Sequence, residues 1–147
     1  MKIEKATIII AILGILDASY LTVIKFTGNK ALCIEGIGDC WTVNNSRYSE
    51  WNGIPISIFG ILAYLSIILI LTLKNRVKFL VDFGNIFVFG IALTGFFFSI
   101  YLTYLQFAVI KAVCPFCIVS ATTMTIVFIL SLITLLKDQK EINSDQT

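Results

Sequence analysis

The sequence predicts an all-α integral membrane protein: a four-helix transmembrane bundle whose outer face carries a loop and short-helix cap. Hydrophobic residues make up 58% of the 147 residues, and charged residues only 14%. The mean hydropathy is +0.93. A soluble domain carries about a quarter charged residues. The apolar residues gather in long runs, and a run of about 20 residues crosses a bilayer as a helix.

Four such runs are present, separated by polar segments. We expect transmembrane helices at about 6–26, 54–73, 85–110 and 116–136. They form one membrane domain, residues 1–137, with an outer loop at 27–53 and a polar cytoplasmic tail at 138–147. The first run carries Asp17 at its middle and has no small-residue cleavage site, so we expect it to stay attached rather than be removed as a signal peptide.

Basic residues predict the orientation of the bundle. They concentrate in three segments: Lys2 and Lys5, then Lys74, Arg76 and Lys78, then Lys137 and Lys140. With four spans these segments share one side, and short loops rich in Lys and Arg stay cytoplasmic. We therefore expect a multi-pass plasma membrane protein with both termini in the cytoplasm and all four cysteines on the extracytoplasmic face. This orientation accounts for the net charge of +2, so the composition gives no support to nucleic-acid binding.

The four cysteines form two closely spaced pairs. Cys33 and Cys40 lie in the outer loop, and Cys114 and Cys117 flank Pro115 at the start of the fourth apolar run. Proline is well tolerated at the first position of a helix, so Cys114 is predicted to cap that helix and Cys117 to lie in its first turn. A helix N-terminus stabilises a thiolate, which is the nucleophile in thiol exchange.

Three uses of these cysteines are open. Two structural disulfides are possible, although both rings are short and a stabilising disulfide gains most by closing a long loop. A zinc site has the right number of ligands, but thiols in an oxidising compartment pair with one another, and we expect no metal. Redox-active pairs would exchange with a soluble thiol protein on one side and a lipid-soluble acceptor, such as a quinone, on the other.

Four stretches of the chain carry a family resemblance. They are CIEGIGDC in the loop, VNNSRYSEWNGIPISIFGILAYL, IYLTYLQFAVIKAVCPFC, and the Cys-x-x-Cys at the start of the fourth helix. With these motifs the sequence resembles the vitamin K epoxide reductase family, specifically its compact microbial members, over nearly the whole chain.

The resemblance implies a membrane thiol-disulfide oxidoreductase with a quinone acceptor. Electrons would pass from a thioredoxin-like (DsbA-like) protein to Cys33, then to Cys40, Cys114 and Cys117, and finally to the quinone. The net effect would be disulfide formation in extracytoplasmic proteins. The chain ends at KDQKEINSDQT without a thioredoxin-like domain, so we expect the partner to be a separate protein.

The resemblance also indicates where the quinone would bind. Vertebrate members carry an asparagine in the second helix and a tyrosine four residues after the last cysteine, and this chain has Ile56 and Ala121 there. We therefore do not expect epoxide reduction. We expect the acceptor to be a quinone of the ubiquinone or menaquinone type. The expected pocket residues are Ser57, Ile56, Phe116 and Ala121.

Asp17 and the loop give two further expectations. An acid inside a membrane helix is costly, and we expect Asp17 to hydrogen-bond Ser19, Thr22 or a neighbouring helix. The alternatives are a proton site for quinone chemistry or for a four-helix proton-coupled small-molecule transporter with structural disulfides. The segment VNNSRYSEW predicts a short helix, capped by Asn44 or Asn45, that lies over the pocket as a lid.

Overall fold

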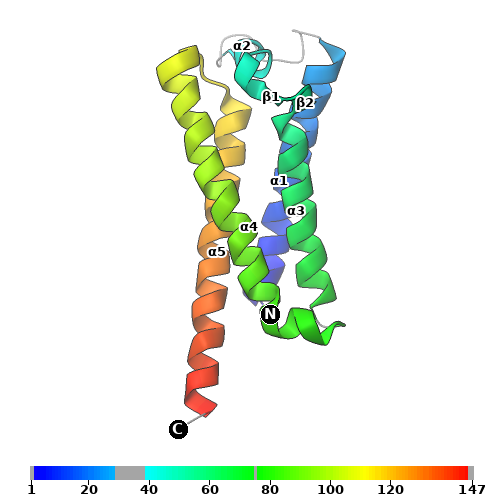
Figure 1. Cartoon of the computed structure of the whole chain (residues 1–147), viewed down its shortest axis with the longest axis vertical. Coiled ribbons are helices and arrows are strands. Elements are labelled where there is room, and N and C mark those ends of the chain that lie inside the picture. Colours follow the sequence, from blue (N-terminus) through cyan, green and yellow to red (C-terminus); the bar gives the residue numbers. More distant parts are fainter. Residues whose placement is uncertain (1, 29–38, 75, 146–147) are drawn as a thin grey trace.

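Four long helices dominate the structure, a computed structural model that describes residues 2–28, 39–74 and 76–145, without the side chains of 141–145. The long helices are α1 (Lys2–Thr27), α3 (Ile56–Leu73), α4 (Lys78–Leu105) and α5 (Pro115–Asp145). A π-helical turn, Gln106–Ile110, extends α4. Figure 1 shows them side by side, with a small cap above one end. The predicted four-helix membrane bundle is confirmed.

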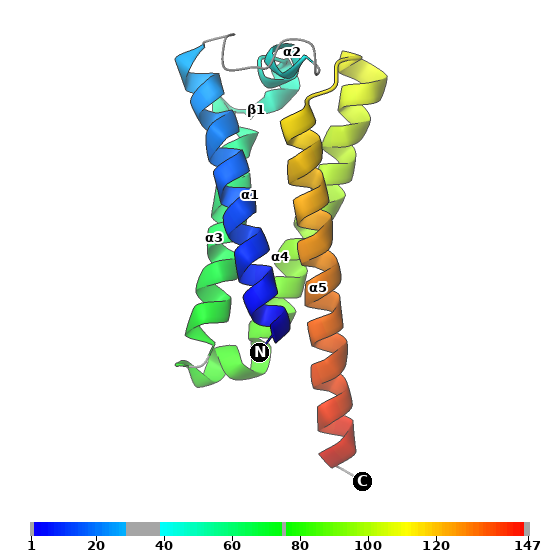
Figure 2. The ribbon, with the colours of Figure 1, turned by 180° about the vertical axis from the view of Figure 1, so that it is seen from behind.

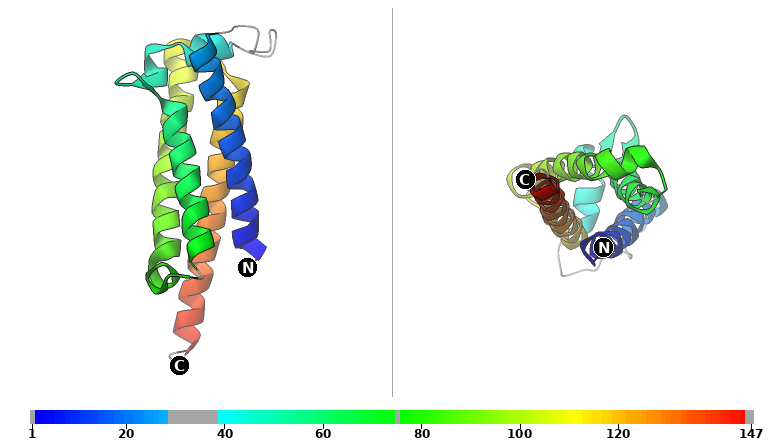
Figure 3. Two further views of the ribbon diagram at one scale, coloured as in Figure 1. Left: turned by 90° about the vertical axis from the view of Figure 1, so that its right-hand side faces the viewer. Right: turned by 90° about the horizontal axis from the view of Figure 1, so that it is seen from below.

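The helices form a closed ring in cross-section. Contacts join α1 to α3, α3 to α4, α4 to α5, and α5 back to α1, and the view from below in Figure 3 shows this arrangement. Figures 1 and 2 show both termini at the end of the bundle opposite α2. The ends of the chain therefore lie far from the cap that carries Cys40.

The outer surface of the bundle is apolar, as a membrane protein requires. Within the described part of the chain, four helices are long and apolar enough to cross a membrane. Large hydrophobic side chains are exposed on every one of them, including Leu16, Leu69, Phe97 and Leu136. Lipid tails are as apolar as leucine, so this exposure is favourable in a bilayer. The chain is a multi-pass membrane protein.

Close packing in the middle of the bundle depends on a glycine. The central core contains Ala11, Tyr64, Ile67, Val88, Ala92, Met124 and Val127. The Tyr64 ring lies so close to α1 that a Cβ atom on Gly14 would be 2.4 Å from it. A small residue thus allows close approach of α1 and α3 here, and the Tyr64 hydroxyl reaches across the bundle to α5.

The cap consists of α2 (Cys40–Asn44), a 3-10 turn (Arg47–Ser49) and a two-stranded hairpin, β1 (Glu50–Trp51) and β2 (Ile54–Pro55). Asn52 and Gly53 join the strands with φ of 53° and 83°. Positive φ at both positions is the type I′ geometry that Asn-Gly favours in hairpins. The Asn-Gly pair is a signal for this hairpin in the sequence.

The short helix of the cap lies earlier than the sequence predicted. It starts at Cys40, and Asp39 caps it by accepting a hydrogen bond from the Thr42 backbone N–H at 3.0 Å. Asn45 stands at its C-terminal end instead. The prediction of Asn44 or Asn45 as the N-cap was wrong because the carboxylate of Asp39 supplies a stronger, charge-assisted cap.

Helix α1 begins at Lys2, slightly before its apolar run, and two helices are much longer than theirs. Helix α4 begins at Lys78 rather than near residue 85, and α5 continues to Asp145 into the segment predicted as a polar tail. Hydropathy reports the part of a helix that suits lipid, whereas backbone hydrogen bonding continues into water wherever no helix breaker intervenes. The ends of both helices therefore could not be placed from hydropathy alone.

Candidate redox site

The chain reverses between α4 and α5 in a bend that positions Cys114. Lys111 has φ of 53°, and the Ala112 N–H donates to the Gln106 carbonyl oxygen at 3.1 Å. The buried side chain of Gln106 accepts the backbone N–H of Cys114 at 3.0 Å. Gln106 therefore fixes the residue before α5. Sequence reasoning did not select this residue, although an amide at the end of an apolar run is a visible signal.

The Cys-x-x-Cys pair stands at the start of α5, as predicted. The helix begins at Pro115, and the N–H of Cys117 donates to the Cys114 sulfur at 3.4 Å. Cys114 is fully buried, and Cys117 is partly exposed. The sulfur of Cys114 thus occupies the capping position of a long helix, where the backbone dipoles favour negative charge.

Hydrogen bonding makes Cys114 a thiolate. The thiol of Cys117 contributes most, the thiol of Cys40 comes next, and together they lower the pKa of Cys114 to about 4. Burial opposes this shift, and backbone N–H groups of the first turn add to it. An ordinary cysteine has a pKa of about 8.5. At neutral pH the Cys114 side chain is therefore a thiolate, which is the nucleophilic form of cysteine.

Cys40 is brought from the cap to Cys114. The Asp39 N–H donates to the Val113 carbonyl oxygen at 3.0 Å, which joins the start of α2 to the bend. Cys40 and Cys114 belong to one buried cluster with Leu21, Ile24 and Val43. Two cysteines that are far apart in sequence therefore lie in hydrogen-bond contact. Cys33 lies outside the described residues.

A lysine fastens the cap to the end of α1. Lys25 donates to the Asn44 carbonyl oxygen at 2.8 Å and to the Ser49 hydroxyl at 2.9 Å, and pairs with Glu50 at 3.4 Å. The Asn44 side chain in turn donates to the Leu21 carbonyl oxygen at 3.0 Å. We refer to this set of contacts as the Lys25 clamp. It holds α2, and with it Cys40, in place.

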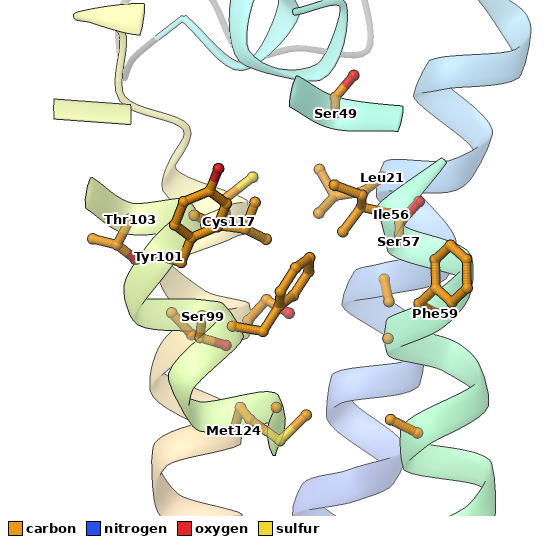
Figure 4. Close-up of a pocket in the computed structure, with 18 of the residues that line it drawn as sticks. Leu21, Ser49, Ile56, Ser57, Phe59, Ser99, Tyr101, Thr103, Cys117 and Met124 are labelled. Carbon is orange, nitrogen blue, oxygen red and sulfur yellow. The ribbon is translucent and has the colours of Figure 1, made fainter. Parts of the chain in front are cut away.

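Below the cap lies a cavity of about 1140 Å³ with mainly apolar walls. Figure 4 shows Cys117 and Tyr101 on one side, Ile56, Ser57 and Phe59 on the other, Ser49 above and Met124 below. Binding sites for small molecules are typically apolar cavities of about 300–1,000 Å³ with a few polar groups. This one is large enough for a substantial lipid-soluble molecule beside a cysteine.

The structure places three of the four expected pocket residues on this cavity. Ile56, Ser57 and Ala121 line it. Phe116 does not, since its ring contacts Tyr20 with centroids 4.8 Å apart and packs against the cluster around Cys40 and Cys114.

The aromatic residues of α4 between Phe96 and Tyr104 divide among three surroundings. Phe98 and Tyr101 line the cavity, whereas Phe96 stacks on Phe128 of α5 with centroids 4.9 Å apart. Phe97 and Tyr104 are exposed on the outer surface. The cluster is therefore part wall, part helix packing and part lipid-facing surface.

Among the described residues, no group of three or more His, Cys, Asp or Glu side chains is placed to hold a metal ion. Instead, the sulfurs of Cys40 and Cys114 are engaged with each other. The arrangement is suited to thiol-disulfide exchange.

Comparison with known proteins agrees with this arrangement. Residues 5–132 match the model of the vitamin K epoxide reductase family. A stretch of 49 residues is 43% identical to the thiol-disulfide oxidoreductase LTO1 of Arabidopsis thaliana; it spans 33% of this chain and 13% of the plant protein. Because the family match covers most of the chain and extends from α1 into α5, the chain belongs to the vitamin K epoxide reductase family.

Proposed function

We propose that the chain is a membrane thiol:quinone oxidoreductase. It takes electrons from a thioredoxin-like protein and passes them through its two cysteine pairs to a quinone. The family and the plant relative, a thiol-disulfide oxidoreductase by name, support the oxidoreductase chemistry. They favour it over the proton-coupled transporter that Asp17 also allowed.

The observation that carries the proposal is the placement of three cysteines. Cys40 of the cap hydrogen-bonds Cys114, and Cys117 beside it lines the apolar cavity. In the proposed transfer the Cys40 thiolate attacks Cys114 of a Cys114–Cys117 disulfide, and Cys117 leaves with the electron pair. Cys33 then attacks Cys40, which forms the Cys33–Cys40 disulfide and leaves Cys114 and Cys117 reduced.

The electrostatics of Cys114 favour this direction of transfer. Stabilising one thiolate of a reduced pair makes the pair a stronger oxidant, because the reduced form is lower in free energy. Cys114 has this stabilisation, since its pKa is about 4. Electrons are therefore drawn from the cap pair toward the pair at the start of α5.

The cavity suits a quinone as the acceptor. Its walls are mainly apolar, and hydroxyl groups of Ser57, Ser99 and Tyr101 lie among them. A quinone bound there would accept two electrons and two protons and leave as a quinol. With Ile56 and Ala121 on the wall, in place of the asparagine and tyrosine of vertebrate members, we propose a ubiquinone or menaquinone type of quinone rather than an epoxide.

The same proposal sets the orientation in the membrane. The cap and its cysteines face the extracytoplasmic side, and both termini face the cytoplasm. The concentration of Lys and Arg at the end opposite the cap supports this. Disulfide formation in extracytoplasmic proteins would then be the result of the relay.

The test is quinone reduction by the purified protein in lipid, with a reduced thioredoxin-like protein or dithiothreitol as donor and ultraviolet absorbance as the readout. We expect quinol to form with the wild type and not with Cys117→Ala. Absence of quinol from a folded wild-type protein, with ubiquinone and menaquinone each tried, would contradict the proposal.

A further inference from the structure

Asp17 is a carboxylic acid in the middle of α1 that the relay described above does not use. Its Oδ2 atom is buried and has no hydrogen-bond partner among the described residues. An unpaired buried polar atom costs free energy. An acid inside a membrane helix is a candidate functional group for that reason.

The other contacts of Asp17 lead to the cavity. Ser120 of α5, one helical turn beyond Cys117, hydrogen-bonds the Asp17 carboxylate. Tyr64 of α3 reaches the same serine, with its hydroxyl 3.4 Å from the Ser120 carbonyl oxygen. Cys117, Ser120 and Tyr64 all line the cavity. Ser120 therefore connects the buried acid to the cavity beside Cys117.

The titratable groups that act on Asp17 come from the helices packed around α1. They are Cys114 and Cys117 at the start of α5, and Tyr64 of α3. Among the described residues, no Lys or Arg side chain acts on the charge of Asp17. The cysteine pair and the acid therefore form one electrostatic unit.

The proposed reaction leaves one proton without a source. Cys114 is a thiolate at neutral pH, so oxidation of the Cys114 thiolate and the Cys117 thiol to a disulfide releases two electrons and only one proton. Reduction of a quinone to a quinol consumes two electrons and two protons. The second proton has to come from another group at the cavity.

We propose that Asp17 supplies this second proton to the bound acceptor through the hydroxyl of Ser120 and is then reprotonated from water. The inference rests on the proposed function and identifies a proton-donating residue for it. Over one turnover the pair loses two electrons and one proton, Asp17 loses and regains one proton, and the quinol carries both protons away.

The test follows formation of the Cys114–Cys117 disulfide in a single turnover. Reduced protein in lipid vesicles is mixed with ubiquinone, quenched with an alkylating reagent and analysed by mass, across a range of pH. For Asp17→Asn we expect a rate at least about 100-fold below wild type, the usual size of an acid–base contribution. The rate should fall further as pH rises, because water must then supply the proton.

Two comparisons separate proton supply from a structural role. Ferricyanide accepts electrons without protons, so Asp17→Asn should be oxidised by ferricyanide at the wild-type rate. Asp17→Glu should recover much of the quinone rate, and Asp82→Asn, a change at an exposed acid of α4, should match wild type.

The outcomes are distinguishable. If the wild type oxidises its cysteines with ubiquinone and Asp17→Asn does so at the same rate and with the same pH profile, the role of Asp17 is refuted and the proposed function stands. Equal losses with ubiquinone and ferricyanide would also refute it, since they would indicate a packing role. If ubiquinone does not oxidise the wild type, the experiment is repeated with menaquinone, and a wild type whose cysteines neither quinone oxidises would overturn both proposals.

Discussion

Hydrogen bonds from Cys117 and Cys40 converge on the sulfur of Cys114. They come from two segments that are distant in sequence, and the larger contribution is that of Cys117. The low pKa of Cys114 is therefore a property of the assembled site, which depends on the docked cap as well as on the helix start. This dependence can be tested one cysteine at a time.

Cys117→Ala should raise the pKa of Cys114 from about 4 toward the ordinary value for cysteine, because it removes the largest stabilising hydrogen bond. Thiolate absorbance of the reduced protein, followed as pH is lowered, measures this. Wild type should keep the Cys114 signal until pH approaches 4, and the variant should lose it at higher pH. Identical titrations would show that Cys117 does not stabilise the thiolate.

The same shift predicts how stability depends on pH. The folded-state pKa of Cys114 is depressed to about 4, against about 8.5 in an unfolded chain. The thiolate therefore contributes its full stabilisation above about pH 8.5. This stabilisation is lost progressively as the pH falls from about 8.5 to about 4. Denaturant titrations of the reduced protein should show this loss, and Cys114→Ala should reduce it. An equal loss in that variant would assign the effect to other groups.

At Gly14 the prediction concerns packing. An added Cβ would lie 2.4 Å from the Tyr64 ring, so Gly14→Ala should destabilise the bundle by about 1–3 kcal/mol, the usual cost of overpacking. Gly90→Ala is the matched control, because a Cβ there meets nothing within 4 Å. Unfolding in mixed detergent micelles gives both values. A neutral Gly14→Ala would mean that Tyr64 can move away from α1.

At the scale of elements, the cap is attached through the Lys25 clamp. Lys25→Met removes two hydrogen bonds and an ion pair that join α1 to the segment from Asn44 to Glu50. We expect the cap to open more often and Cys40, only 2% exposed, to react faster with a maleimide. Lys111→Met, at an exposed lysine of the bend, is the control. Unchanged labelling in Lys25→Met would show that other contacts hold the cap.

The bend between α4 and α5 is the second element with a specific requirement. Gln106→Leu leaves the buried N–H of Cys114 without its acceptor, which costs about 1–3 kcal/mol. Gln106→Glu keeps an acceptor oxygen at this position and should retain more of the stability than Gln106→Leu. Denaturation of the two variants side by side checks this. Equal losses would show that the side-chain acceptor contributes little.

Whether an element can be predicted from the sequence depends on how far apart in the sequence its contacting residues lie. The start of α5 was predictable, because Pro115 and the spacing of Cys114 and Cys117 act locally. The Asn-Gly hairpin was equally local and was overlooked. Gln106 bonds Cys114 only eight residues on, across the bend, whereas the contacts of Lys25 join segments that are remote in sequence. A single sequence contains no signal for such pairings.

At the scale of the whole molecule, hydropathy alone was enough to predict the four-helix bundle. Lipid requires every spanning helix to have a similar length and an apolar outer surface. Hydropathy could not give the ring order of the helices or the cavity beneath the cap, which arise from side-chain packing. For Asp17, the expected partner on a neighbouring helix is Ser120 of α5, whereas Thr22, the other candidate, bonds Ser57 instead.

A polar cluster closes the end of the bundle opposite the cap. Lys74 pairs with Glu4 at 2.9 Å and donates to the Asn85 side chain at 3.0 Å, and Asn85 donates to Asp138. These residues come from α1, α3, α4 and α5 or their ends, so the cluster ties the four helices together. It lies at the opposite end of the bundle from Cys40, Cys114 and Cys117.

The most direct test of the relay is to trap its middle step. In the double variant Cys33→Ala, Cys117→Ala, the remaining Cys40 and Cys114 should form a disulfide rapidly under mild oxidation, as seen by mass after alkylation. In Cys33→Ala, Cys114→Ala, the pair Cys40 and Cys117 should link far more slowly, because Cys114 is the residue that the cap contacts. Equal rates, or faster linkage to Cys117, would contradict the transfer of electrons from Cys40 to Cys114.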